Sequence, residues 1–67
     1  MERKVVTKGG GKNLFKVSEY DSKYYVYQVD GGFFGSKNSI GETRSLEDAL
    51  SLIKSFSGKQ IEKITSW

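Results

Sequence analysis

The sequence predicts an α+β fold, in which one helix packs on one face of a small antiparallel or mixed sheet of three or four strands, in the order β-β-β-α-β. Short runs of β-branched and aromatic residues, separated by turn residues, occupy most of the chain before residue 43. One stretch, residues 43–58, has helical periodicity instead. With 67 residues, the chain is long enough for one hydrophobic core and one domain.

Residues 1–12 are predicted to be a flexible basic arm, with at most a short edge strand at residues 4–7, and residues 13–67 to form the single α+β domain. After Met1, two valines are the only apolar side chains of the arm. Gly9-Gly10-Gly11 then favours a flexible hinge. Lysines flank these glycines as in a phosphate-binding loop, but the spacing of the nucleotide-binding motifs is missing, so a hinge is the favoured interpretation.

Residues 14–20 and 24–29 are rich in β-branched and aromatic side chains, and Asp21-Ser22-Lys23 between them is typical of a turn. We expect these two runs to form a hairpin. Asp30-Gly31-Gly32 indicates a second reversal of the chain. The third strand is then residues 32–35, residues 38–43, or a bent combination of both.

The length of the first turn decides which side chains share a face of the sheet. With a two-residue turn, Asp21-Ser22, Val17 pairs with Val26. One face then holds Phe15, Val17, Tyr24 and Val26, and the other holds Leu14, Lys16, Tyr20, Lys23, Tyr25, Tyr27 and Val29.

With a three-residue turn, the register changes by one residue. The face toward the helix then holds Phe15, Val17, Tyr25, Tyr27 and Val29, and the outer face holds Lys16, Ser18, Tyr20, Tyr24, Val26 and Gln28. This division into inside and outside is cleaner and is favoured, because burial of one face specifies the register. Under both alternatives, Lys16 and Tyr20 share the outer face.

The helix is predicted to begin after Ser45, a good N-cap residue, and to stop at Gly58. Its apolar positions follow a period of 3.6 residues and are Leu46, Ala49, Leu50, Ile53 and Phe56.

Residues 60–67 are predicted to be the last strand, parallel to a neighbour through a right-handed crossover. Ile61 and Ile64 have opposite parity, so either a bulge intervenes or one of them points outward. Trp67 is expected to be buried at the sheet edge.

Positive charge is concentrated near the amino terminus. Residues 1–16 carry five basic side chains and one acidic side chain. Residues 17–67 carry six basic and seven acidic side chains. The net charge of +3 and this basic segment favour an anionic partner such as nucleic acid, although a solvated terminus has the same composition.

The chain contains no Cys and no His, which excludes disulfides, thiolate zinc sites, a cysteine nucleophile and an imidazole base. Glu19 and Asp21 flank a turn, whereas acid–base catalysis needs paired carboxylates in an enclosed cleft. We expect no enzymatic activity, no cofactor and no metal. No apolar run approaches the roughly 18 residues that cross a bilayer, and no secretory signal is visible, so we expect a cytoplasmic protein without membrane association.

A hairpin, a third strand ending in Ile40-Gly41-Glu42-Thr43, and a helix beginning Ser45-Leu46-Glu47-Asp48-Ala49 follow one another here. This order resembles the three-strand-plus-helix DNA-binding domains of plant ethylene-response factors and of some integrase amino termini. The basic and tryptophan-rich strand positions of those domains are mostly missing, and a final strand is added, so we assign the chain to neither family.

The leading functional hypothesis is a small binding module for nucleic acid, in which lysines contact phosphates and rings stack on bases. Phe33 and Phe34 lie between glycines, where one ring is expected to face the core and the other to be exposed, unless both cap the sheet. The candidate binding residues are Lys8, Lys12, Lys16, Lys23, Tyr20, Tyr24, Phe33 and Phe34. The alternative is a protein-interaction or homodimerising domain that buries the same aromatic face.

Overall fold

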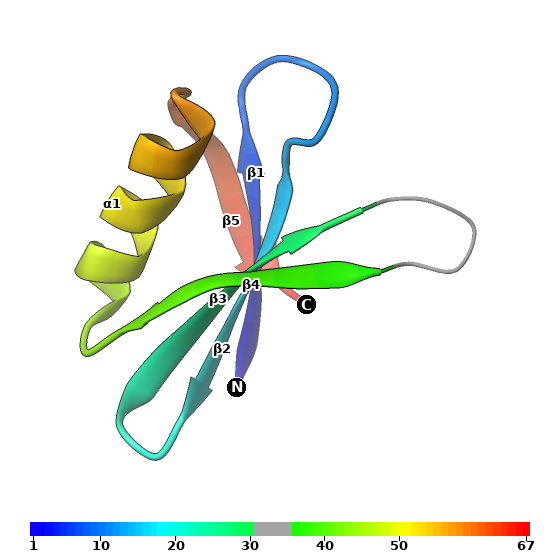
Figure 1. The fold of residues 1–67 in the computed structure, drawn as a ribbon. Helices are drawn as coiled ribbons and strands as arrows, with labels where there is room; N and C mark the ends of the chain where they lie inside the picture. The colour runs from blue at the N-terminus through cyan, green and yellow to red at the C-terminus, as the bar shows by residue number, and fades with distance from the viewer. Residues whose placement is uncertain (31–35) are drawn as a thin grey trace.

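The computed structural model describes residues 1–30 and 36–67, which form one five-stranded antiparallel sheet and one helix (Figure 1). This is the predicted α+β class, with one strand more than the highest number expected. The strand order across the sheet is β4-β3-β2-β1-β5. The elements are β1 (Glu2–Thr7), β2 (Leu14–Tyr20), β3 (Lys23–Val29), β4 (Lys37–Thr43), α1 (Leu46–Ser57) and β5 (Ile61–Ser66).

β1 is an interior strand, paired with β2 on one side and with β5 on the other. The expectation of a flexible arm or edge strand is therefore wrong for residues 2–7. Val5 and Thr7 are fully buried, so the segment contributes to the core despite its basic composition. The glycines belong to the loop that follows, where the Asn13 side chain donates to the carbonyl oxygens of Thr7 at 3.3 Å and Gly9 at 3.1 Å.

The turn between β2 and β3 has two residues. Asp21 and Ser22 have φ angles of 54° and 63°, and Tyr20 pairs directly with Lys23. Two successive residues in the left-handed region match the twist of a tight hairpin, and Asp tolerates this conformation. The favoured three-residue turn is therefore wrong, and Val17 pairs with Val26.

The strand that follows the hairpin is β4, which agrees with the alternative of residues 38–43; residues 32–35 lie outside the described residues. The pairing changes from Val26 with Gly41 to Tyr27 with Ser39, which leaves Ile40 in a bulge. Gly41 has a φ angle of 154°, and a Cβ atom there would lie 2.9 Å from a methyl group of Leu52.

The helix forms as predicted. The Ser45 hydroxyl accepts a hydrogen bond from the Asp48 N–H at 3.1 Å. At the other end, Gly58 has a φ angle of 69°, and its N–H donates to the Lys54 carbonyl. Among the described residues, no helix has the length and apolar character required to cross a membrane.

β5 pairs with β1 and runs antiparallel to it, so the predicted parallel neighbour is wrong. The connection through α1 carries the chain across β3, β2 and β1 to the far edge of the sheet. β5 still runs in the same direction as β4, but the two strands are not adjacent. A register shift places Ile61 opposite Thr7 and Ile64 opposite Val5, so a bulge turns both isoleucines toward the helix side.

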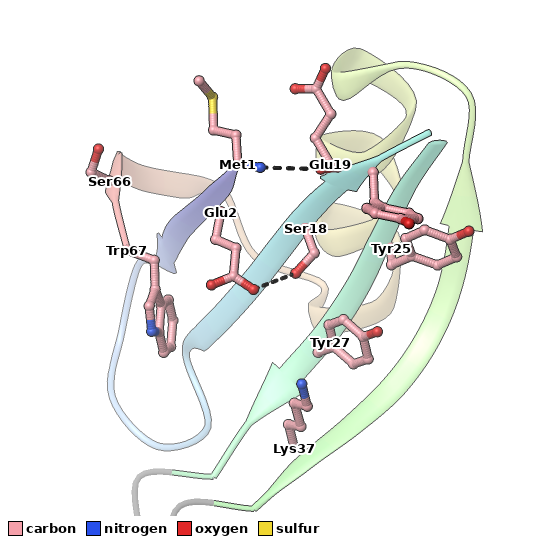
Figure 2. Close-up of a pocket in the computed structure, with 10 residues that line it drawn as sticks. Met1, Glu2, Ser18, Glu19, Tyr25, Tyr27, Lys37, Ser66 and Trp67 are labelled. Atoms are coloured by element: carbon pink, nitrogen blue, oxygen red, sulfur yellow. Dashed lines mark hydrogen bonds between the residues drawn. The ribbon is translucent and has the colours of Figure 1, made fainter. Parts of the chain in front are cut away.

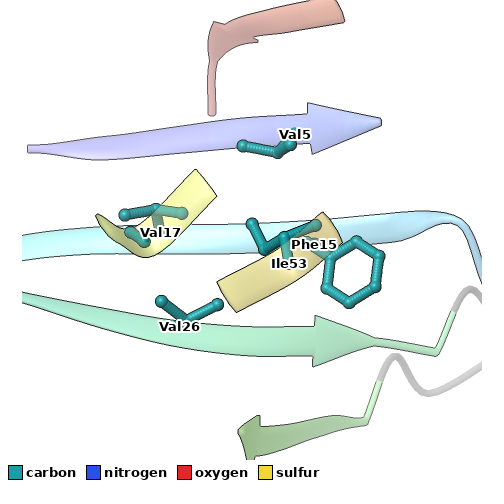
Figure 3. Packing of buried hydrophobic residues seen from close by; sticks show 6 residues of the cluster. Val5, Phe15, Val17, Val26 and Ile53 are labelled. Carbon is teal, nitrogen blue, oxygen red and sulfur yellow. The ribbon is translucent and has the colours of Figure 1, made fainter. Parts of the chain in front are cut away.

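The core lies between α1 and one face of the sheet (Figure 3). In this view Ile53 of α1 lies next to Phe15, while Val17 and Val26 lie on the neighbouring strands β2 and β3. The Phe56 ring meets the Phe15 ring edge-on, with 6.2 Å between centroids. The fully buried apolar side chains are Val5, Phe15, Val17, Val26, Ala49 and Ile53. Because α1 covers only this face, the opposite face of the sheet carries no helix of the described residues (Figure 1).

Candidate functional site

We call the face of the sheet opposite α1 the open face. Its members follow from the alternation of side chains and from the observed register. They are Glu2, Lys4 and Val6 of β1; Leu14, Lys16, Ser18 and Tyr20 of β2; Lys23, Tyr25, Tyr27 and Val29 of β3; Lys37, Ser39 and Glu42 of β4; Lys63 and Thr65 of β5; and Trp67.

The open face contains a depression that is open to solvent and has a volume of about 870 Å³ (Figure 2). Glu2 and Ser18 lie in its middle, with the Trp67 ring on one side and the tyrosines of β3 on the other. The depression is lined by Met1, Glu2, Ser18, Glu19, Tyr20, Tyr25, Tyr27, Lys37, Ser66 and Trp67.

Two rings of the open face, those of Trp67 and Tyr27, lie beside lysine ammonium groups. The Nζ atoms of Lys16 and Lys4 are 5.0 Å and 5.6 Å from the Trp67 ring centroid. The Nζ atom of Lys37 is 4.6 Å from the centroid of Tyr27. These distances are in the range of cation–π attraction. Each of these rings therefore has a positive charge next to it, and 48% of Trp67 is exposed.

Glu2 is the acidic group in the middle of this surface. Its Oε2 atom lies 3.0 Å from the Lys16 ammonium and accepts a hydrogen bond from the Ser18 hydroxyl at 3.1 Å. The hydrogen bond from Lys16 is the main cause that lowers the pKa of the Glu2 carboxyl below its ordinary value of 4.5, and Ser18 and Lys37 lower it further against the effect of burial. Glu2 is therefore ionised at neutral pH.

The open face has a positive charge. Among the described residues, its side chains include five lysines and two glutamates, an excess of three positive charges. The second glutamate, Glu42, lies at the β4 edge, 3.8 Å from Lys23, and both side chains are about half exposed. A pair this exposed is weak and is screened by salt.

The structure brings together some of the residues predicted for the site. Lys16, Lys23 and Tyr20 lie on the open face, where Tyr20 is 73% exposed. Lys8 and Lys12 are exposed in the loop that joins β1 to β2, beyond the end of the sheet.

Tyr24 is not on the open face. It lies on the side covered by α1, packs against the core, and has the Arg3 guanidinium 6.0 Å from its ring centroid. Its predicted position depended on the three-residue turn, which the observed register contradicts. Phe33 and Phe34 fall outside the described residues.

Sequence reasoning missed Tyr25, Tyr27 and Trp67 as candidates. The signal for the tyrosines was the Asp21-Ser22 pair, because a two-residue turn puts both rings on the open face. Trp67, expected to be buried, is about half exposed. Its backbone N–H donates to the Glu2 carbonyl at 3.1 Å, and its ring lies beside lysines of the open face rather than in the core.

Metal ligation has no support among residues 1–30 and 36–67, where no three acidic side chains gather. Comparison of the chain with protein-family models, curated proteins and solved structures found no match.

Proposed function

We propose that this protein is a non-enzymatic, cytoplasmic module that binds single-stranded nucleic acid across the open face of its sheet. The observation that carries the proposal is that stackable rings line one depression and that lysines lie beside two of them, Lys37 at Tyr27 and Lys4 and Lys16 at Trp67 (Figure 2). Rings stack on bases of any sequence, and lysines attract the phosphates between them. Tyr25, Tyr27 and Trp67 are proposed to stack, and Lys4, Lys16 and Lys37 to contact phosphates.

A single strand suits this surface better than a duplex. The rings project from a sheet, and a base can stack on them only after it has left its own stack. A duplex reader usually inserts a helix into the major groove. Here α1 packs on the core through its apolar stripe and carries Glu47 and Asp48 in its first turn, where they would repel phosphates.

The salt dependence of binding tests the proposal. We expect a labelled oligothymidylate of about 16 nucleotides to bind at low ionic strength, since sites of this type span roughly 4 to 16 nucleotides. With three lysine contacts, a plot of log affinity against log salt should have a slope of about −2, because each phosphate contact to a single strand contributes about −0.7. A duplex of the same length should bind more weakly. Absence of binding at low salt would overturn the proposal.

Two matched pairs of variants localise the interface. Trp67→Leu should weaken binding by about tenfold, the effect of losing one stacked base, whereas Phe56→Leu should not, because Phe56 is a similarly exposed ring on α1. Lys37→Gln should weaken binding and reduce the salt slope, whereas Lys54→Gln on α1 should change neither. Equal effects within either pair would place the interface elsewhere.

The alternative function is a protein-interaction or homodimerising domain that uses the same face. A specific observation favours it: Val6 pairs with Leu14 on the open face, and neither is fully buried. Together with Val29 and the tyrosines they form an apolar area that a second copy of the chain could cover. Sedimentation equilibrium at increasing protein concentration distinguishes the two functions. A stable dimer whose dissociation is insensitive to salt would favour the alternative, and a monomer would remove its homodimeric form.

A further inference from the structure

Glu2 lies where a polyanion crossing the open face would have to pass. A strand that stacks on Trp67 at one side of the depression and on Tyr27 at the other passes over the Glu2 carboxylate between them (Figure 2). In its present position this carboxylate repels phosphate. It is also held by two donors, the Lys16 ammonium at 3.0 Å and the Ser18 hydroxyl at 3.1 Å. An ammonium and a hydroxyl close together are groups that also bind a phosphate oxygen.

The two members of the Glu2–Lys16 ion pair differ in exposure. The Lys16 side chain is only 14% exposed, whereas that of Glu2 is 46% exposed. Lys16 is also held in place by the Trp67 ring, 5.0 Å from its Nζ atom. The cation is therefore the fixed partner, and the carboxylate is the partner that can rotate into solvent. A partly desolvated ammonium that loses one anion favours a second anion in its place.

We infer that Lys16 and Ser18 form a phosphate subsite that the Glu2 carboxylate occupies when no nucleic acid is bound. The inference rests on the proposed function. A phosphate of the bound strand displaces Glu2 and takes over its contacts with the Lys16 ammonium and the Ser18 hydroxyl. Glu2 thereby acts as an internal competitor that weakens binding of every single strand, whatever its sequence.

The test compares two variants that remove the same charge from the same face. Glu2→Gln keeps the size of the side chain and its ability to contact Ser18 but removes the competing charge. Glu42→Gln is the control, since Glu42 pairs with Lys23 at the sheet edge and not with Lys16. We expect Glu2→Gln to bind the oligothymidylate about three to ten times more tightly than the wild type at low salt, and Glu42→Gln to bind less than about twice as tightly, in line with the weak exposed pair. Circular dichroism spectra of the variants check that they are folded.

A third variant locates the gain. Added to Lys16→Met, the Glu2→Gln change should give no increase in affinity over Lys16→Met alone, because the subsite has lost its cation. If the wild type binds but Glu2→Gln does not bind more tightly, or if Glu42→Gln gains as much, the subsite is wrong and the proposed function stands. If neither the wild type nor Glu2→Gln binds single strands, the proposed function fails and the inference fails with it.

Discussion

Glu2 also gives the fold a measurable pH dependence. The pKa of its carboxyl is lowered in the folded state, chiefly by the hydrogen bond from Lys16. A carboxyl with a lowered pKa stabilises the fold above its unfolded pKa, and this contribution is lost as the pH falls through the folded value. We expect urea unfolding between about pH 5 and pH 2 to show a steeper loss of stability for the wild type than for Glu2→Gln. Parallel curves for the two proteins would show that the ion pair does not stabilise the fold.

Gly41 is a position at which glycine is required. Its φ angle is 154°, and an added Cβ atom would lie 2.9 Å from the Leu52 side chain. The contact can relax, because the neighbouring atom is the end of a flexible side chain, but the backbone conformation is unfavourable for any residue with a Cβ atom.

Gly41→Ala should therefore lower the free energy of unfolding by about 1–3 kcal/mol, the usual cost of such backbone strain. Gly10→Ala is the matched control. A Cβ atom there meets nothing within 4 Å, so this variant should be close to wild type. Urea unfolding of the two variants measures the difference. Similar free energies of unfolding would mean that a side chain at position 41 introduces no strain.

At the level of elements, the β2–β3 turn sets the register that builds the open face. Asp21 and Ser22 both have positive φ angles, yet neither is glycine. In a residue with a Cβ atom, this conformation lowers the stability of the fold by about 1–2 kcal/mol. Glycine avoids that cost, but its greater freedom in the unfolded chain lowers the stability by about 0.5–1 kcal/mol.

Ser22→Gly should therefore stabilise the protein by about 0.5–1 kcal/mol, since Asp-Gly is a preferred sequence for this turn. The same exchange within a strand, Ser39→Gly, should destabilise it, because glycine weakens strands. Thermal unfolding followed by circular dichroism measures both. A destabilised Ser22→Gly variant would argue against the two-residue turn and thus against the composition of the open face.

At the level of the whole molecule, stability depends on a small core. A chain of this length typically has a free energy of unfolding of about 3–10 kcal/mol. Phe15 is fully buried at the centre of the core, and Phe56 contacts it from α1 with 52% of its own surface exposed.

Phe15→Ala should cost about 3–5 kcal/mol and leave much of the protein unfolded, because it opens a cavity in a core that has little reserve. Phe56→Ala should cost about 1 kcal/mol, the value of an aromatic pair at a partly exposed site. Urea unfolding distinguishes them. If both variants lost the same free energy of unfolding, packing of the helix rather than of the sheet would limit the stability of the protein.

The helix and most strands of this protein could be predicted from the sequence because they depend on residues that are close together in the chain. Ser45 caps the N–H three residues on, Gly58 ends the helix, and the apolar period selects Ala49 and Ile53 for burial. The hairpin strands and the last strand were predicted from composition for the same reason. The turn at Asp21 was located correctly, but its length was not, and a difference of one residue moved Tyr24 off the candidate site and moved Tyr25 and Tyr27 onto it.

The remaining features depend on residues far apart in the chain. Val5 lies in a short basic segment that predicts little by itself, yet it pairs with Phe15 on one side and with Ile64 on the other, and these contacts make β1 an interior strand. The same pairing carries Trp67 to Lys4 and Lys16. Local sequence sets the type of each element because its hydrogen bonds and caps are local. The order of the strands, and with it the composition of the open face, follows from burial of apolar surface shared by distant segments, which no single segment encodes.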